Sequence, residues 1–168
     1  IGINQLVNYQ MSAIEEDQFE FRHDSMEKYK DMIYLHLRNN HAVLTQDNEM
    51  AIFNDGTAKF EALLKDLEQA SDHIHMQYYI FRLDNLGKRI REVLTRKAKE
   101  GIKVRLLFDD MGSRGVYKRH FHDLIRNGGK VEAFFPSILP LINTRLNYRN
   151  HRKIVVIDGQ IAYLGGFN

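Results

Sequence analysis

An alternation of short apolar runs with helical stripes, between residues 50 and 135, limits the possible folds more than any other feature of the sequence. The runs are rich in β-branched and aromatic residues, which favours strands at residues 50–53, 73–81, 103–110 and 130–135. Apolar residues three or four apart predict helices between these strands, at residues 57–70, 87–101 and 114–129. Parallel strands need a long crossover connection, so this order predicts a mostly parallel sheet flanked by helices.

The last part of the sequence has a different pattern. Two apolar runs, residues 153–157 and 160–164, are separated by Asp158 and Gly159. An Asp-Gly pair between apolar runs is typical of a two-residue β-hairpin turn. The expected fold class is therefore α/β, with a mostly parallel sheet that is flanked by helices and ends in a β-hairpin.

Residues 1–48 lack this alternation, and we expect a lead-in segment with one helix. That helix lies within residues 25–40, where an apolar stripe is formed by Met26, Tyr29, Ile33 and Leu37. Residues 49–168 then form the second part of the chain. Because the sequence begins with Ile1 rather than Met, we expect it to be a piece of a longer protein.

The composition excludes some kinds of site. The formal net charge is only +2, so an anion-binding site must be a local cluster rather than a property of the whole surface. The sequence has no cysteine, which excludes disulfides and thiolate zinc sites. Its apolar runs are much shorter than the roughly 20 residues that a membrane-spanning helix needs.

A cationic segment precedes the first hairpin strand. Between Glu132 and Asp158 there is no acidic residue, whereas the basic residues of this stretch are Arg145, Arg149, Arg152 and Lys153. His151 and Lys153 are two residues apart, so on a strand they would point to the same side. Such a cluster suits a phosphate or a carboxylate. Imidazole can attack phosphorus, and lysine can stabilise the charge on the phosphate oxygens.

Further residues complete the expected site. Gly165 and Gly166 would let the backbone come close to a ligand, and Asn168 could donate an amide hydrogen bond to an anion. Arg149 is expected to help bind the same phosphate. We group Asp158 with the candidate catalytic residues, although its place in the turn favours a structural or supporting role.

The residues from 151 to 168, HRKIVVIDGQIAYLGGFN, resemble the signature of the phospholipase D superfamily. That signature is His, one residue, Lys, four residues, Asp, six residues, two small residues, one residue and Asn. The segments HMQYYIFRLDNLG, VRLLFDDMGSRG and VEAFFPS are similar to bacterial cardiolipin synthases of the phospholipase D type. The resemblance covers about residues 50–168, and it extends more loosely to the lead-in segment.

The resemblance implies that residues 49–168 are the first half of a phospholipase-D-like catalytic domain, truncated at its carboxyl end. Such enzymes join two phosphatidylglycerol molecules into cardiolipin and release glycerol. His151 would form a phosphatidyl-histidine, and a missing carboxyl-terminal half with a second motif would donate the proton. Neither metal nor cofactor is implied. The parent would act at the bacterial cell membrane, on its cytoplasmic side, whereas this fragment alone would be inactive and soluble or peripheral.

Other interpretations stay open. A single-motif phosphodiesterase or nuclease could complete its site as a homodimer, and a non-catalytic module could bind anionic head groups. The modest charge and the apolar residues 134–143 favour an anionic membrane surface as partner and count against nucleic acid. His73 and His75 are more simply explained as sheet residues than as a metal pair. Asp109 and Asp110 could be catalytic acids or part of a capping turn.

Overall fold

The computed structural model describes residues 2–136 and 149–168. Contacts within the chain divide it into two compact units, Ile1–Ile52 and Phe53–Asn168. Within the described residues, no helix combines the length and the apolar character needed to cross a membrane.

The first unit is built on two helices. Its elements are α1 (Ile3–Glu15), the 3-10 helix η1 (Asp24–Tyr29) and α2 (Lys30–Asn40). The helices share one small core, whose buried apolar side chains are Val7, Ile14, Ile33 and Leu37. The expectation of a single helix in this part of the chain is therefore wrong, because α1 precedes the predicted one.

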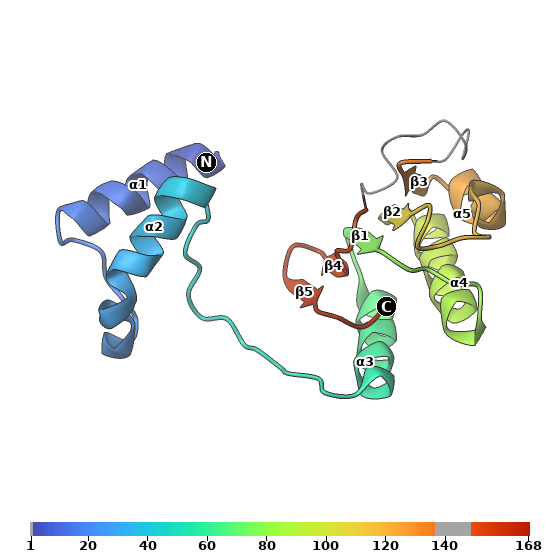
Figure 1. The fold of residues 1–168 in the computed structure, drawn as a ribbon, viewed down its shortest axis with the longest axis horizontal. Helices are drawn as coiled ribbons and strands as arrows, with labels where there is room; N and C mark the ends of the chain where they lie inside the picture. Colours follow the sequence, from blue (N-terminus) through green and yellow to red (C-terminus); the bar gives the residue numbers. More distant parts are fainter. Residues whose placement is uncertain (1, 137–148) are drawn as a thin grey trace. The chain divides into compact units, whose positions relative to one another are not determined.

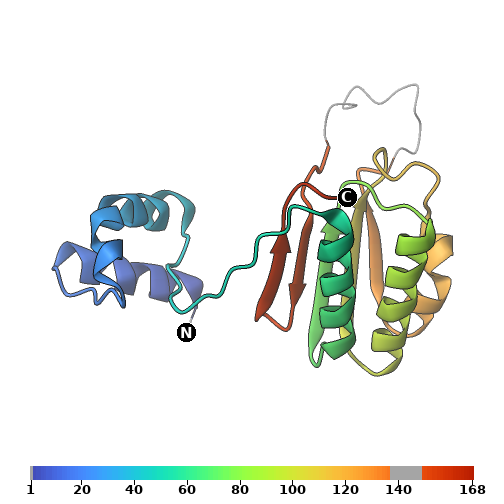
Figure 2. The same cartoon turned by 90° about the horizontal axis from the view of Figure 1, so that it is seen from below.

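The second unit contains the predicted sheet (Figures 1 and 2). Its helical elements are α3 (Gly56–Gln69), α4 (Asn85–Lys99), the 3-10 helix η2 (Lys118–Phe121) and α5 (His122–Arg126). Its strands are β1 (His73–Tyr78), β2 (Lys103–Asp109), β3 (Lys130–Phe134), β4 (Ile154–Ile157) and β5 (Ile161–Leu164). The strand order is β3-β2-β1-β4-β5. Among these described strands only β4 runs against the others, which confirms a mostly parallel sheet with a terminal hairpin.

Helices α3, α4 and α5 lie on one face of this sheet (Figures 1 and 2). Alternate strand residues point to that face and are buried, as Ile74 and Met76 are on β1. They pack against the apolar stripes of the helices, which include Leu63 and Leu67 of α3. This burial of apolar area is the main stabilising contribution to the unit.

Two local predictions are wrong. Residues 50–53 form no strand: Met50 and Ile52 are 83% and 87% exposed, because no strand among residues 2–136 and 149–168 pairs with the run. The helix predicted at residues 114–129 is reduced to the short elements η2 and α5. One reason is Gly115, whose φ of +89° lies in the left-handed region and interrupts a right-handed helix.

The strand directions decide which residues share an edge of the sheet. β4 is antiparallel to β1, with Ile157 opposite Ile74 and Ile154 opposite Gln77. The residues before β4 and after β5 therefore lie at the carboxyl ends of β1 and β2, the edge where open α/β sheets bind ligands. The hairpin turn between β4 and β5 lies at the opposite edge, where β1 begins.

Candidate active site

Tyr79, the first residue after β1, is the centre of the candidate site. Its ring stacks against the imidazole of His151, with ring centroids 3.8 Å apart and 16° between the ring planes. The Lys153 ammonium lies over the same ring, 5.2 Å from its centroid. Lys153 Nζ also donates a hydrogen bond of 2.8 Å to the backbone oxygen of His151. The structure thus brings the histidine and the lysine of the motif together on one aromatic side chain.

A buried carboxylate, Asp109 at the end of β2, holds the segment that carries His151. Asp109 Oδ2 accepts a hydrogen bond from the backbone nitrogen of Asn150 at 2.8 Å. Its other oxygen accepts from the amides of Met111 and Gly112, at 3.1 and 2.9 Å. Asp109 is only 2% exposed, so these bonds replace the water that it loses. Of the two interpretations left open for Asp109, the structural one fits these contacts.

The loop after β2 also positions Tyr79. Ser113 is fully buried; its Oγ donates to the Tyr79 carbonyl oxygen at 3.2 Å and accepts from Phe81 N at 2.8 Å. Gly112 packs so closely that an added Cβ would lie 2.4 Å from the Tyr79 oxygen and 2.8 Å from its ring. Tyr79 is not among the predicted site residues, because residues 73–81 were expected to be one continuous strand.

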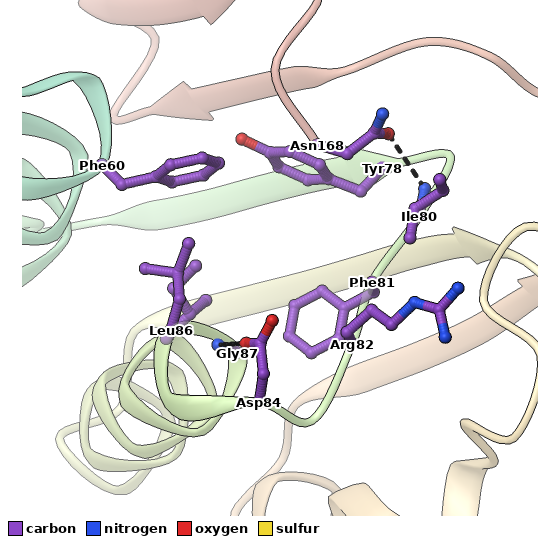
Figure 3. Close-up of a pocket in the computed structure, with 10 residues that line it drawn as sticks. Phe60, Tyr78, Ile80, Phe81, Arg82, Asp84, Leu86, Gly87 and Asn168 are labelled. Atoms are coloured by element: carbon purple, nitrogen blue, oxygen red, sulfur yellow. Dashed lines mark hydrogen bonds between the residues drawn. The ribbon is translucent and has the colours of Figure 1, made fainter. Parts of the chain in front are cut away.

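Asn168 lies beside the loop after β1, which contains Tyr79 (Figure 3). Its Oδ1 accepts a hydrogen bond of 3.1 Å from the backbone nitrogen of Ile80, the residue after Tyr79. Its amide nitrogen makes no hydrogen bond within the described parts of the chain, so a donor remains for a ligand. Asn168 also borders an apolar cavity of about 70 Å³, whose other lining residues include Phe60, Tyr78, Phe81, Leu86 and Ile90.

The other predicted phosphate-binding residues lie at the same edge of the sheet. Gly165 and Gly166 are exposed, and a Cβ added at either would meet no atom within 4 Å. Packing within the described residues therefore does not require glycine there, and their closeness to a ligand stays a prediction. Arg149 is half-buried and directly precedes Asn150, so it is close in the chain to His151.

Asp158 lies away from these residues, in the turn at the opposite edge. Its carboxylate accepts hydrogen bonds from the backbone nitrogens of Ser71, Asp72 and His73, each at 2.8 Å, and from the Ser71 hydroxyl at 2.9 Å. The amides of His73, Asp72 and Ser71 hold the pKa of Asp158 well below its usual range. These contacts fasten the hairpin to the start of β1 and support a structural role, and β4 separates Asp158 from His151. A catalytic role for Asp158 stays a prediction.

His73 and His75 lie next to each other on β1, with ring centroids 4.8 Å apart. His73 Nδ1 lies 2.7 Å from a carboxylate oxygen of Asp72. Burial is the main cause that lowers the pKa of His75, and the positive charges of the neighbouring His73 and Arg105 lower it further. Residues 2–136 and 149–168 contain no cluster of three or more side chains arranged to hold a metal ion.

Most of the apolar residues 134–143, which we expect to contact a membrane surface, lie outside the described residues, and so does Arg145. Phe134 and Phe135 are described: their rings are 5.1 Å apart, and Phe135 is 39% exposed. Contact between these residues and lipid stays a prediction.

Comparison with known families shows where this site belongs. A family model described as the PLD-like domain of cardiolipin synthase matches residues 63–168, which include every motif residue from His151 to Asn168. The chain belongs to this family.

Two curated relatives extend the likeness to the first unit. All 168 residues align at 52% identity with the major cardiolipin synthase of Bacillus subtilis and at 53% with the cardiolipin synthase of Listeria welshimeri. Each match covers 100% of this chain and 35% of the relative, so the chain spans about a third of their length. Among solved structures, the phospholipase D family member Nuc of Salmonella typhimurium has a TM-score of 0.48 at 21% identity, covering 64% of this chain and 62% of that one.

Proposed function

We propose that residues 49–168 of this chain are the first half of the catalytic domain of a cardiolipin synthase. The complete enzyme joins two phosphatidylglycerol molecules into cardiolipin at an anionic membrane surface and releases glycerol. The observation that most supports this is the placing of His151 and Lys153 on the Tyr79 ring, at the edge of the sheet where Asn168 also lies. The family match over residues 63–168 supports the same chemistry.

The reaction proceeds in two displacements at phosphorus. An imidazole nitrogen of His151 attacks the phosphate of the first lipid, a P–N bond forms, and the P–O bond to the glycerol headgroup breaks. A hydroxyl of the second lipid's glycerol headgroup then attacks phosphorus, a P–O bond forms, and the P–N bond breaks. Lys153 and the amide nitrogen of Asn168 stabilise the negative charge on the non-bridging oxygens in both steps.

The chain alone is inactive under this proposal. The departing alkoxide needs a proton, and the attacking nitrogen of His151 is occupied by phosphorus at that moment. A second motif, outside this chain, donates that proton and later removes one from the incoming hydroxyl. General acid–base help of this kind is worth about a hundred- to ten-thousand-fold in rate.

The proposal is tested in the full-length enzyme, with phosphatidylglycerol vesicles as substrate and cardiolipin and glycerol as the measured products. His151→Ala should abolish both products because it removes the nucleophile. Lys153→Ala should lower the rate while the melting temperature stays unchanged. His122→Ala is the matched control, because His122 is an exposed histidine on α5, away from the motif, and its variant should behave as wild type.

Retained cardiolipin synthesis in His151→Ala would contradict the assignment of the nucleophile. Release of phosphatidic acid without any cardiolipin would show transfer to water, and would favour a phosphodiesterase. Both outcomes are read in the same assay, by separating the lipid products.

A further inference from the structure

Three motif residues converge on two consecutive positions of the chain. His151 stacks on the Tyr79 ring, Lys153 lies over that ring, and Asn168 binds the backbone nitrogen of Ile80. The motif itself is spread over the segments before β4 and after β5. The segments on both sides of the hairpin therefore contact the same short loop, which follows β1.

Tyr79 is itself held on more than one side. The buried hydroxyl of Ser113 binds the Tyr79 carbonyl oxygen, and Gly112 leaves no space for the ring to move toward the loop after β2. Asp109, at the start of that loop, also binds Asn150, the residue before His151. One loop therefore positions both partners of the stack, the tyrosine ring and the imidazole.

We propose that Tyr79 is the positioning residue of this site: its ring is the surface on which the His151 imidazole is oriented and the Lys153 ammonium is held. The catalytic consequence rests on the proposed function, whereas the stacking itself can be measured without any reaction. Tyr79 is not required to touch the phosphate, and its hydroxyl has no part in the proposal.

The physical need for such a surface follows from the exposure of the histidine. His151 is exposed, so its two side-chain torsions would be free without a neighbouring group. A stacked ring restricts both torsions and keeps the attacking nitrogen in one direction. The same π face attracts the Lys153 ammonium, which keeps positive charge beside the nucleophile. Misplacing a reacting group by about 1 Å can cost about a hundredfold in rate.

The first measurement is NMR on the 168-residue chain. Nuclear Overhauser effects should connect the Tyr79 ring protons with the His151 imidazole protons, and the imidazole signals should be shifted upfield by the ring current. Tyr79→Phe should keep this shift, whereas Tyr79→Leu should remove it. Tyr117→Leu is the matched control: Tyr117 is an exposed tyrosine whose ring lies 5.7 Å from that of His120, so only the His120 signals should move.

The second measurement is kinetic, in the full-length enzyme. Tyr79→Leu should lower kcat by roughly 10- to 100-fold with little change in KM, because the lipid still binds but the nucleophile is less well oriented. Tyr79→Phe should retain wild-type kcat, which a role for the hydroxyl would not allow. Tyr117→Leu should leave both constants unchanged.

Each outcome addresses one claim. Absence of the Overhauser effects in the wild-type chain would overturn the stacking of His151 on Tyr79, even if Tyr79→Leu did not fold. A folded Tyr79→Leu whose His151 signals keep their wild-type upfield positions, and whose kcat equals that of wild type, would overturn it as well. Activity retained in His151→Ala would overturn the proposed function while the stacking measurement stood. If Tyr79→Phe lowered kcat as much as Tyr79→Leu does, the role would belong to the hydroxyl, and the proposed role of the ring would be wrong.

Discussion

Asp158→Asn separates a structural carboxylate from a catalytic one. Asp158 accepts four hydrogen bonds from Ser71, Asp72 and His73, and it lies at the edge of the sheet opposite His151. Its φ of +54° is left-handed, and asparagine tolerates that conformation better than most residues. The substitution therefore leaves the backbone unstrained and changes only the hydrogen bonds and the charge of the side chain.

The magnitude follows from counting acceptors. An amide has one oxygen, so it keeps the bonds of one carboxylate oxygen and turns an NH2 group toward the donors of the other. About two hydrogen bonds are lost, and each is worth about 1 kcal/mol at a partly exposed position. We expect the free energy of unfolding to fall by about 2 kcal/mol, which for a unit of this size lowers the melting temperature by about 8 °C.

The pH dependence has a definite sign. The amides of His73, Asp72 and Ser71 hold the pKa of Asp158 below that of an unfolded aspartate. Its stabilising contribution is therefore complete above pH of about 4 and is lost as the pH falls further, because the unfolded state takes up a proton first. The difference between wild type and Asp158→Asn should shrink on going from pH 7 to pH 3.

Urea unfolding of the 168-residue chain, followed by circular dichroism, measures these differences. Glu92→Gln on α4 is the control, because it removes an exposed carboxylate of the same unit. It should stay within about 0.5 kcal/mol of wild type. An Asp158→Asn variant that is as stable as the control at pH 7, yet inactive in the full-length enzyme, would show that Asp158 acts in catalysis.

Two further predictions concern packing and charge. Gly112→Ala should destabilise the chain by about 1 to 3 kcal/mol, because its Cβ would meet Tyr79. Gly165→Ala is the control and should keep the wild-type melting temperature, because a Cβ there meets no atom within 4 Å. Equal melting temperatures for the two variants would refute the close packing at Gly112. Burial lowers the pKa of Lys59, whose ammonium donates to the Tyr78 hydroxyl, to about 8. The unfolded state therefore binds more protons between pH 8 and pH 10, so stability should rise by at most about 2 kcal/mol over that range. Lys59→Met should remove the rise in urea unfolding at the two pH values, and an unchanged rise would assign it to another group.

Hydrophobic periodicity predicted the sheet well, because a sequence in which strands alternate with helices is compatible with few other fold classes. It failed where the formation of a strand depends on a neighbouring strand, which the local sequence pattern does not indicate. Residues 50–53 have the composition of a strand, but no strand in the described part of the chain pairs with them. The missed helix α1 did have a signal: Val7, Met11 and Ile14 are spaced four and three apart, as on a helical face.

The candidate site was predictable only in part. The linear spacing of His151, Lys153 and Asn168 identified the groups that the structure places at one edge of the sheet. Tyr79 and Asp109 act through tertiary contacts, since β4 inserts beside β1, and no local pattern indicates which strand a hairpin will join. The predicted strand continued through Tyr79 to Phe81, whereas β1 ends at Tyr78 and leaves Tyr79 to face the motif.

The most direct test of the account is to find the residue that becomes covalently attached to lipid. The full-length enzyme is mixed with phosphatidylglycerol, quenched by denaturant without acid, digested, and analysed by mass spectrometry. We expect a phosphatidyl adduct on His151 that is absent from His151→Ala. An adduct on a histidine of the second motif, or cardiolipin formed by His151→Ala at the wild-type rate, would contradict it.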